Sequence, residues 1–491
     1  MLSRSSSGAS KHFRNKFFIK YKKKYPLLFF IPYIYKMSST INIIDPVYFN
    51  NQTRAEFRLD HENVAYLSSG CYLALGGFGA DALLTEVNYN RRAGVAGLVS
   101  SIRLLNGGDV LAQLDNAGSW MAFRGLNKNN ADAFSKKMMP CSATGLMHNG
   151  IANAAVQEVI STSDAATQRG QPGESELECS LGYLSITEFL KELETLRVLP
   201  TAIFDNLRLV VQFSRDLKDI LQQQTRDNGT AVTAFTKVRP LLIVESVSDP
   251  EIISSMIADM GNVRLNCIES DQFVVPQVTE EIGRQRVQKQ LRGFNSKIVN
   301  RVLIVNKATS ATEGVVQSAV DGAVAVNPTV ALDSGKLNSL VQNRLTINAR
   351  VNGRNIFQGQ GLGYDDTQTG TVGCGTNHRL GCLTDTWGDV AICAGGNSTG
   401  LVVSGLSTEA TINNLIANDM GAFFYGSDYT GFRILDRVSH LEFDYGRSHI
   451  AGVTRSIMNS TAPNQALDVI VFAEVPKVVQ VSGGSYRVAY L

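Results

Sequence analysis

Four residues in the second half of the chain are of the types that bind zinc: Cys374, His378, Cys382 and Cys393. Structural zinc is usually held by cysteine thiolates and histidine imidazoles, and the ligands commonly come in C-x-x-C pairs. The spacing of these four residues contains no such pair, and two of them fall in a glycine-rich stretch. We therefore predict isolated thiols near a surface loop and no metal site.

Acid–base chemistry is the next candidate, because His440 and His449 flank Glu442 and Asp444. An imidazole within hydrogen-bonding reach of a carboxylate can act as a general base. The same stretch, however, has an apolar residue at every second position, Leu441-Phe443-Tyr445. A period of two is typical of a strand with one buried face. The alternation therefore predicts a strand and no catalytic dyad.

Short motifs with a known mechanism give no further candidate. The zinc-hydrolase motif H-E-x-x-H and the kinase signature set do not occur in the sequence. Asn228 and Asn397 begin N-x-[ST] sequences, which lead to glycosylation only on a secretory route. Four glycines lack the G-K-[ST] that completes a phosphate-binding loop: Gly70, Gly76, Gly77 and Gly79. We expect no enzyme activity, no catalytic, cofactor-binding or metal-binding residue, and no cofactor.

The composition indicates a protein with much buried or interface surface. The chain has 491 residues, of which 44% are hydrophobic and only 18% charged. This length is enough for two large β-domains, and the 43 glycines suit a fold with many turns. Seven cysteines at irregular spacing argue against a secreted disulfide scaffold and suit a reducing compartment.

The charge is divided unevenly between the N-terminus and the rest. Residues 1–36 hold seven Lys and two Arg and no acid, whereas the remainder holds 37 basic and 44 acidic residues. The body is therefore mildly acidic and has no general attraction to nucleic acid. The N-terminal segment has three interpretations: a signal peptide, a basic arm that contacts packaged DNA or a membrane, or an upstream extension of the reading frame. We favour the extension, with the natural start at Met37. The apolar run from Tyr25 to Tyr35 is too short to span a membrane.

The strongest strand signal lies between Leu98 and Leu126. Polar and apolar residues alternate from Ser101 to Leu105, and Asn106-Gly107-Gly108-Asp109 supplies residues that accept a positive φ in a tight turn. The apolar pattern resumes after the turn, and we expect the large side chains of Trp120 to Phe123 to extend the sheet. The stretch 98–106 also matches residues 298–306 at an offset of 200 residues. This repeat suits one β-domain that occurs twice in tandem.

The strand–turn–strand IRLLNGGDVLAQLD and the W-M-A-F element that follows it resemble the first jelly roll of a double jelly-roll major capsid protein. The proteins of this family occur in Polinton-like viruses, virophages and related eukaryotic double-stranded DNA viruses. Three other stretches are similar to the same family: Ala55 to Leu75, Leu196 to Phe213, and the final VSGGSYRVAYL. The resemblance covers Asp45 to Leu491. It implies a mainly β fold of two tandem antiparallel jelly rolls, which are β-sandwiches, with short decorating helices.

Other segments complete the expected fold. We expect a helix after the capping box Ser185-x-x-Glu188, one at Pro250 with Asp249 as its cap, and a charged helix over Thr279 to Arg292. Asn130 to Met139 and Thr408 to Met420 are also expected to be helical. Asn352-Gly353 and Ser482-Gly483-Gly484 predict hairpin turns, and strands are expected at 55–60, 207–213, 345–351 and 467–471. Three stretches are expected outside the cores: a linker at 222–230 and the loops Gly145 to Glu178 and Gly359 to Gly381.

These expectations define three domains: a basic arm or upstream extension at 1–44, a first jelly roll at 45–235 and a second at 236–491. The resemblance implies a structural protein that forms homotrimers, which tile an icosahedral virion shell around double-stranded DNA. Its partners would be itself, neighbouring trimers, and penton and minor capsid proteins, without sequence-specific contact to nucleic acid. Assembly would take place inside the infected host cell, in the cytoplasm or the nucleus. The alternatives are a β-sandwich protein that binds a surface, such as a spike or lectin-like protein, and a capsid-like protein of an integrated viral element.

Overall fold

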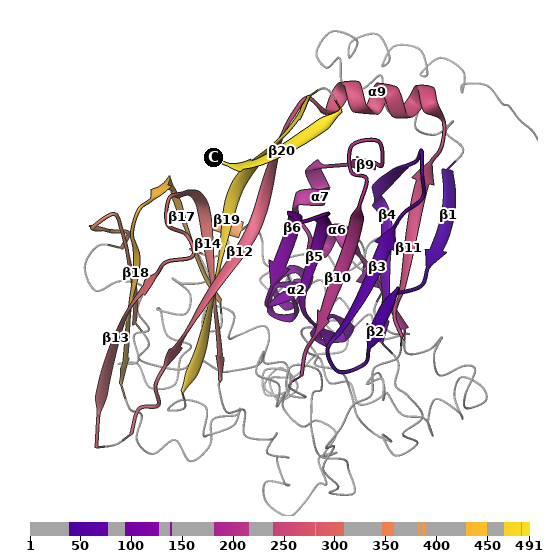
Figure 1. Ribbon diagram of the computed structural model, residues 1–491. Coiled ribbons are helices and arrows are strands. Elements are labelled where there is room, and N and C mark those ends of the chain that lie inside the picture. The colour runs from indigo at the N-terminus through magenta and orange to yellow at the C-terminus, as the bar shows by residue number, and fades with distance from the viewer. Residues whose placement is uncertain are drawn as a thin grey trace, which may run out of the picture. The chain divides into compact units, whose positions relative to one another are not determined.

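The computed structural model describes residues 39–76, 94–126, 138–139, 181–215, 239–279, 281–308, 346–357, 382, 385–387, 429–448, 466–482 and 484–491 (Figure 1). Several predictions lie outside these residues: the N-terminal segment 1–36, the linker at 222–230, the two long loops, the helix at Thr408 to Met420 and the N-x-[ST] sites. Of the stretch Asn130 to Met139, the structure describes only a two-residue strand, β7 (Met138–Met139). No helix among the described residues has the length and apolar character to cross a membrane.

The first roll consists of two antiparallel sheets. One sheet has the order β1-β11-β4-β8-β7, with β9 also paired to β4, and the other has the order β2-β3-β10-β5-β6. The strands are β1 (Ser39–Ile44), β2 (Tyr48–Asn50), β3 (Arg54–Leu59), β4 (Ala65–Gly76), β5 (Val99–Asn106), β6 (Asp109–Asp115), β8 (Leu181–Ser185), β9 (Val198–Pro200), β10 (Leu207–Phe213) and β11 (Leu241–Val247). A short 3-10 helix, η2 (Gly94–Leu98), leads into β5.

The second roll also consists of two antiparallel sheets, of order β12-β19-β14-β17, with β20 paired to β19, and β13-β18-β15-β16. Its strands are β12 (Asn262–Val275), β13 (Arg284–Leu291), β14 (Lys297–Ala308), β15 (Thr346–Val351), β16 (Arg354–Asn355), β17 (Tyr429–Val438), β18 (Leu441–Ser448), β19 (Leu467–Ser482) and β20 (Ser485–Tyr490). Both rolls lie within the compact unit Ile41–Leu491.

The two rolls repeat one strand order. In the first roll β3, β10, β5 and β6 lie side by side, and in the second roll β12, β19, β14 and β17 do so. The repeated segments of the sequence therefore occupy the same place, because β5 pairs with β10 as β14 pairs with β19. Ile102 lies opposite Val211, and its counterpart Val302 lies opposite Ala473. The offset of 200 residues thus corresponds to a structural repeat.

Local turn chemistry sets the hairpins where it was predicted. Gly107 has a φ of 59° in the turn between β5 and β6, and Asn352 and Gly353 have φ values of 52° and 81° between β15 and β16. A positive φ at both central residues, as in Asn352-Gly353, or at the first of them, as at Gly107, is the geometry by which a two-residue turn matches the twist of its strands. Helix α9 (Pro250–Met260) begins as predicted, because the Asp249 carboxylate accepts hydrogen bonds from the backbone N–H groups of Glu251 and Ile252.

The prediction that the W-M-A-F element extends the sheet is wrong, because Ala117–Leu126 forms helix α2. Ala117, Trp120 and Met121 are buried at positions i, i+3 and i+4, the spacing of one helix face. The large side chains are buried as expected, but through a helix. Residues 186–196 also differ from the prediction, since they form two short helices, α6 (Ile186–Phe189) and α7 (Glu192–Thr195). The Ser185 side chain makes no capping bond to the backbone and instead contacts the Thr187 hydroxyl at 2.8 Å.

The predicted helix at Thr279 to Arg292 is also wrong. Its residues from Arg284 to Leu291 form β13, which pairs with β18 along its whole length. Arginine, glutamine and lysine favour a helix in isolation, but a strand partner outweighs this weak preference. By contrast, the predicted strands at 55–60, 207–213, 345–351, 441–445 and 467–471 are confirmed by β3, β10, β15, β18 and β19.

Candidate functional site

Of the residues first considered for chemistry, the structure describes Cys382, His440, Glu442 and Asp444, whereas His449 lies outside the described residues. Of the four zinc-type residues only Cys382 is described, and the described residues contain no group of three or more His, Cys, Asp or Glu side chains placed to hold a metal ion. His440 is 3.4 Å from Glu442 and bonds the amide of Gln290 at 2.8 Å. Asp444 instead pairs with Arg286 on the neighbouring strand. These side chains make cross-strand contacts on β18, as the alternation predicted.

A different region, the junction between the two rolls, gathers most of the buried polar and aromatic side chains. Strands β14 and β19 are buried on both faces there. Val302 and Ile304 belong to the core of the second roll, whereas Leu303 and Val305 belong to a core shared with the first roll. On β19, Phe472 contributes to the shared core in the same way. One continuous hydrophobic core therefore joins the rolls within one chain.

Four aromatic rings form the centre of this shared core. Trp120 of α2 lies 5.7 Å from Trp387 and 5.5 Å from Phe472, measured between ring centroids. Phe123 lies 5.8 Å from Trp387. Edge-to-face pairs at these distances contribute about 0.5–1.5 kcal/mol each beyond the area that they bury. The chain has two tryptophans, so both lie at this one place.

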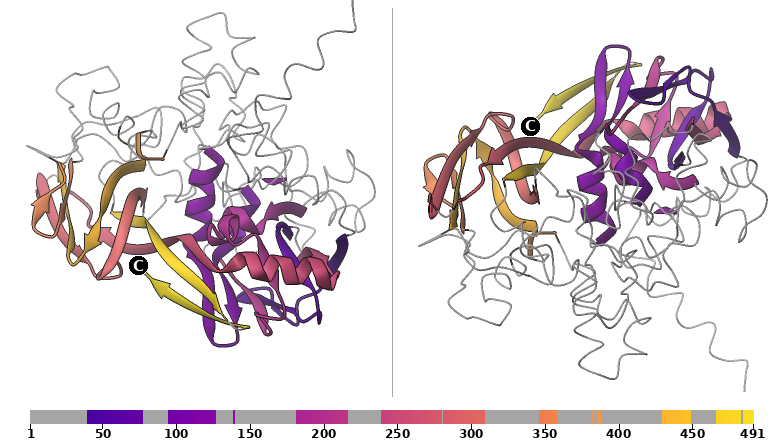
Figure 2. Two further views of the ribbon diagram at one scale, coloured as in Figure 1. Left: turned by 90° about the horizontal axis from the view of Figure 1, so that it is seen from above. Right: turned by 90° about the horizontal axis from the view of Figure 1, so that it is seen from below.

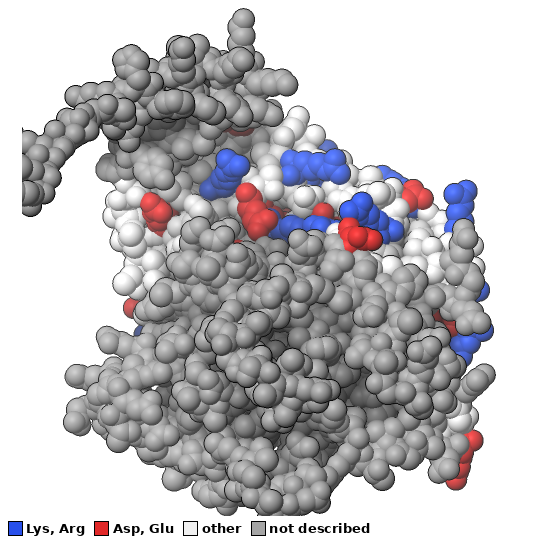
Figure 3. Space-filling model, turned by 180° about the vertical axis from the view of Figure 1, so that it is seen from behind, with Lys and Arg blue, Asp and Glu red and all other residues white. Residues whose placement is uncertain are grey.

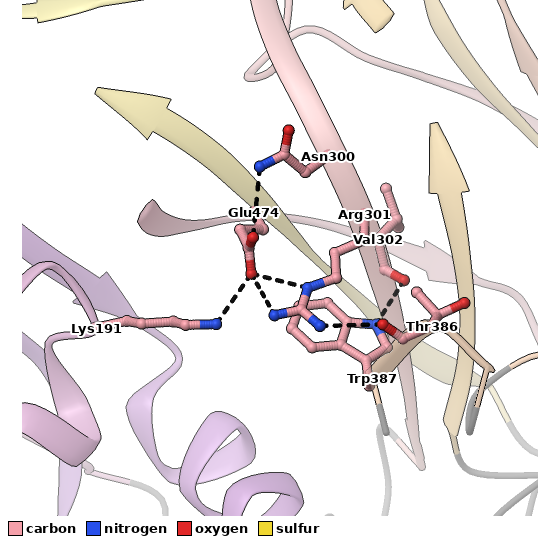
Figure 4. Close-up of polar contacts among 7 residues, drawn as sticks. All are labelled: Lys191, Asn300, Arg301, Val302, Thr386, Trp387 and Glu474. Atoms are coloured by element: carbon pink, nitrogen blue, oxygen red, sulfur yellow. Dashed lines mark hydrogen bonds and ion pairs between the residues drawn. The ribbon is translucent and has the colours of Figure 1, made fainter. Parts of the chain in front are cut away.

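Glu474 is the polar centre of the junction (Figure 4). Its Oε2 atom accepts hydrogen bonds from Lys191 at 2.9 Å and from Arg301 at 2.6 and 2.8 Å. Lys191 belongs to the first roll, immediately before α7, whereas Arg301 and Glu474 belong to β14 and β19 of the second. The carboxylate thus bridges the two rolls with charge-assisted hydrogen bonds, which are about twice as strong as neutral ones.

Trp387 completes this cluster from one side. Its indole N–H donates to the Val302 carbonyl at 3.0 Å, and the Arg301 guanidinium lies 4.0 Å above its ring. Arg301 also donates to the Thr386 carbonyl at 3.0 Å. A buried indole that has both a hydrogen-bond partner and a cation over its face is held in one orientation.

The surroundings of Glu474 favour its ionised form. Burial raises the pKa of a carboxyl, but Lys191 and Arg301 outweigh this effect and hold the pKa of Glu474 below its ordinary value. The side chain of Glu474 is only 8% exposed. Removing one partner from a buried ion pair is costly because the other charge is left uncompensated. The cluster therefore keeps the two rolls together at neutral pH.

Hydrogen bonds at two further places connect the rolls. Asn116, after β6, donates to the Ser270 hydroxyl of β12 at 3.2 Å. Tyr486 of β20 accepts from Asn106 at 3.1 Å and donates to Asp109 at 3.0 Å. The β19–β20 hairpin reaches from the second roll over the first to make the Tyr486 contacts (Figures 1 and 2). The rolls are thus joined by hydrogen bonds as well as by the shared core.

Sequence reasoning missed the junction. Lys191 and Glu474 are 283 residues apart, so no local motif connects them. One usable signal was present in β14: the run Val302 to Val305 is continuously apolar, which indicates a strand buried on both faces. The corresponding run of β5 contains Arg103 in place of Leu303.

No protein-family model matches the sequence, and no curated protein matches it. Solved structures match over nearly the whole chain. A chain of the PBCV-1 virus capsid has a TM-score of 0.50 at 10% sequence identity, with 93% of this chain and 97% of that chain covered. The mavirus major capsid protein has a TM-score of 0.49 at 10% identity, with 100% and 96% covered. At this identity the similarity shows the fold. It confirms the expected mainly β architecture of two tandem antiparallel jelly rolls, and with it the resemblance to double jelly-roll capsid proteins.

Proposed function

We propose that the chain is a structural major capsid protein, which self-associates into homotrimers that tile an icosahedral shell around double-stranded DNA. The observation that carries the proposal is the pair of jelly rolls with one strand order, fixed to each other by a shared core. Two similar rolls held in fixed relation give one subunit two similar lateral faces. Three such subunits form a nearly hexagonal unit, which suits tiling. Because this function is structural, it is tested by measuring the assembly of the protein and not by an enzyme assay.

Exposed apolar side chains support self-association. Ile41, Ile43 and Val47 are 69%, 67% and 64% exposed, and they lie on or next to the first two strands. Neighbouring exposed apolar residues of this size are a common mark of a protein–protein interface. The charged side chains on the face in Figure 3 are mixed in sign, which gives no single-sign field toward nucleic acid. We therefore place a neighbouring copy of the chain on the apolar strand β1.

The wider setting follows from this role. The partners would be neighbouring trimers and penton and minor capsid proteins, and the location would be the virion, after assembly in the cytoplasm or nucleus of the host cell. The sequence divides the chain into a basic arm or upstream extension at 1–44 and two rolls at 45–235 and 236–491. Since β1 (Ser39–Ile44) and β11 (Leu241–Val247) belong to a sheet of the first roll, we place that roll at 39–247 and the second roll after it. The arm that would contact DNA or a membrane, or the upstream extension, is then the segment before Ser39.

The test is the mass of the purified full-length protein under native conditions. We expect three chains per particle, and shells or hexagonal arrays by electron microscopy at high concentration. The double variant Ile41→Lys, Ile43→Lys should stay folded and become monomeric. Val274, which is 53% exposed on β12, offers the control substitution Val274→Lys, which should stay trimeric. A monomeric wild-type protein that binds a glycan or a cell surface would instead support the spike or lectin-like alternative.

A further inference from the structure

A second carboxylate lies in the junction, and its surroundings differ from those of Glu474. Glu192 begins α7 in the first roll and is 1% exposed. One carboxylate oxygen lies 3.4 Å from the backbone N–H of Gln113 on β6. The other oxygen is buried, and the one described side chain that contributes a hydrogen bond to the carboxylate is the thiol of Cys267. A buried carboxylate with a distant amide and a thiol, a weak donor, as its partners has lost most of its hydration with little compensation.

Strands of the second roll enclose this carboxylate. Its titratable and charged neighbours are Cys267 of β12 and Lys477 of β19, and these two in turn lie near Glu269 of β12 and Tyr490 of β20. Cys267 and Lys477 are 0% and 2% exposed. Helix α7 and strand β6 of the first roll both contact β12. Glu192 therefore lies where the two rolls meet.

Glu269, which lies near Cys267 and Lys477, already has a cation. Lys297 of β14 donates to the Glu269 carboxylate at 2.6 Å and to the Gly293 carbonyl at 2.9 Å. The ammonium groups of Lys297 and Lys477 lie 4.7 and 4.8 Å from the centre of the Tyr490 ring. Glu192 thus has Lys477 as its nearest compensating charge, but makes no ion pair with it within 4.0 Å among the described contacts.

We propose that Glu192 is a proton-sensitive latch between the two rolls. When Glu192 is neutral, α7 lies tightly against β12 and β19. When Glu192 is ionised, the buried charge weakens this contact and loosens the junction. The latch is a property of the folded chain, so it holds whether or not the chain builds a shell.

The electrostatics agree with this geometry. Burial raises the pKa of Glu192 to about 7, although Lys477 and hydrogen bonds from the backbone N–H groups of Glu192 and Gln113 and from the Cys267 thiol act in the opposite direction. Burial and the nearby Glu192 also raise the pKa of Cys267, so its thiol stays protonated. The pKa of Lys477 is raised as well: burial lowers it, but Cys267 and Glu192 more than offset this, so Lys477 stays charged. Glu192 is therefore the group of this cluster that changes charge near neutral pH.

The direction of the effect follows from linkage. In the unfolded chain Glu192 loses its proton near its ordinary pKa, and in the folded chain near 7. The unfolded state therefore binds fewer protons between these two values, and stability falls as the pH rises through this window. The junction is tightest in mild acid and loosest above neutral pH.

Tryptophan fluorescence tests the proposal, because both tryptophans of the chain lie in the junction. The full-length protein and its Glu192→Gln variant would be unfolded in urea at several pH values from 5.5 to 8.5. Glutamine keeps the shape and stays neutral. We expect the ratio of the variant's folding equilibrium constant to that of the wild type to rise roughly tenfold or more between pH 5.5 and pH 8, as a pKa displacement of more than one unit requires. Glu194→Gln, an exposed carboxylate on the same helix, is the matched control and should follow the wild type.

A second measurement keeps the proposal testable if Glu192→Gln does not fold. The Lys477→Met variant removes the nearest cation while Glu192 stays in place. Its junction should loosen at a higher pH than the junction of the wild type. Hydrogen exchange at residues 263–269 should follow the same midpoint, with 286–290 of β13 as the reference. The latch would be overturned by either of two results. One is a ratio of the folding equilibrium constants of Glu192→Gln and wild type that is the same at every pH. The other is a Lys477→Met variant whose junction loosens at the same pH as that of the wild type, or at a lower one.

Discussion

Strands β5 and β14 hold the same place in the two rolls but have different surroundings. Both have one face in a roll core, through Ile102 and Leu104 in β5 and Val302 and Ile304 in β14. The other face of β5 is half-buried and includes Arg103, whose side chain is 41% exposed in its ion pair with Asp115. On the other face of β14, Leu303 and Val305 are buried in the core shared with the first roll. The two strands thus share their place in the roll and their apolar core face. They differ in the opposite face, which is partly exposed in β5 and packs against the other roll in β14.

Exchanging the second-face residues tests this difference most strongly. Leu303→Arg places a charge in the shared hydrophobic core. A loss of about 4–5 kcal/mol, or failure to fold, is expected, since burial of an unpaired charge is among the most destabilising changes. Urea unfolding followed by tryptophan fluorescence measures it. A loss below about 1 kcal/mol, the range of ordinary surface substitutions, would show that this face is not buried.

The aromatic centre gives the next largest effect. Phe472→Ala removes a ring that contacts Trp120, and we expect a loss of about 3–5 kcal/mol, as for other large-to-small core changes. Because the core is shared, both rolls should lose stability in one transition. Calorimetry measures this directly. Two separated transitions in the wild type would mean that the rolls fold independently.

The ion pair of the junction should contribute less and should depend on acidity. Glu474→Gln removes the carboxylate that Lys191 and Arg301 share, but their side chains are 14% and 26% exposed and retain some contact with water. A loss of about 2 kcal/mol at pH 7 is expected, below the full value for a sealed pair. The pKa of Glu474 is lowered in the folded chain, so this contribution is present at neutral pH and is lost as the pH falls through and below the ordinary carboxyl range. Stability profiles of variant and wild type should therefore converge in acid.

The smallest effect should come from the first-roll counterpart. Arg103→Leu removes an exposed ion pair with Asp115 and leaves the core face of β5 unchanged. We expect a change of less than about 1 kcal/mol, typical of exposed pairs. If this variant lost as much stability as Leu303→Arg, the two strands would not differ in the way described.

The predictable part of the fold is local. Asn352-Gly353 and Asp249-Pro250 were identified from sequence because turn geometry and helix capping depend on adjacent residues. Helix α2 was missed because the large side chains of Trp120 and Phe123 were interpreted as part of a strand. Their separation of three residues, which is typical of one helix face, was not considered. Strand β13 was missed because its pairing with β18 outweighs the helix preference of its side chains. The junction was missed because its contacts join residues hundreds of positions apart, which no local pattern records.

The β19–β20 hairpin has a consequence for the order in which the chain is made. Tyr486, Val479 and Val488 pack against the shared core and cover the first roll from the far end of the chain. At roughly 5–20 residues per second, the ribosome makes Tyr486 roughly 10–50 seconds after Val247, the last residue of the first roll's sheets. The first roll therefore waits through the synthesis of the whole second roll with part of its apolar surface bare. During this time chaperones can bind the exposed apolar surface, and premature contacts can form on it. Both end only when the last strands, β19 and β20, have been made and cover the first roll.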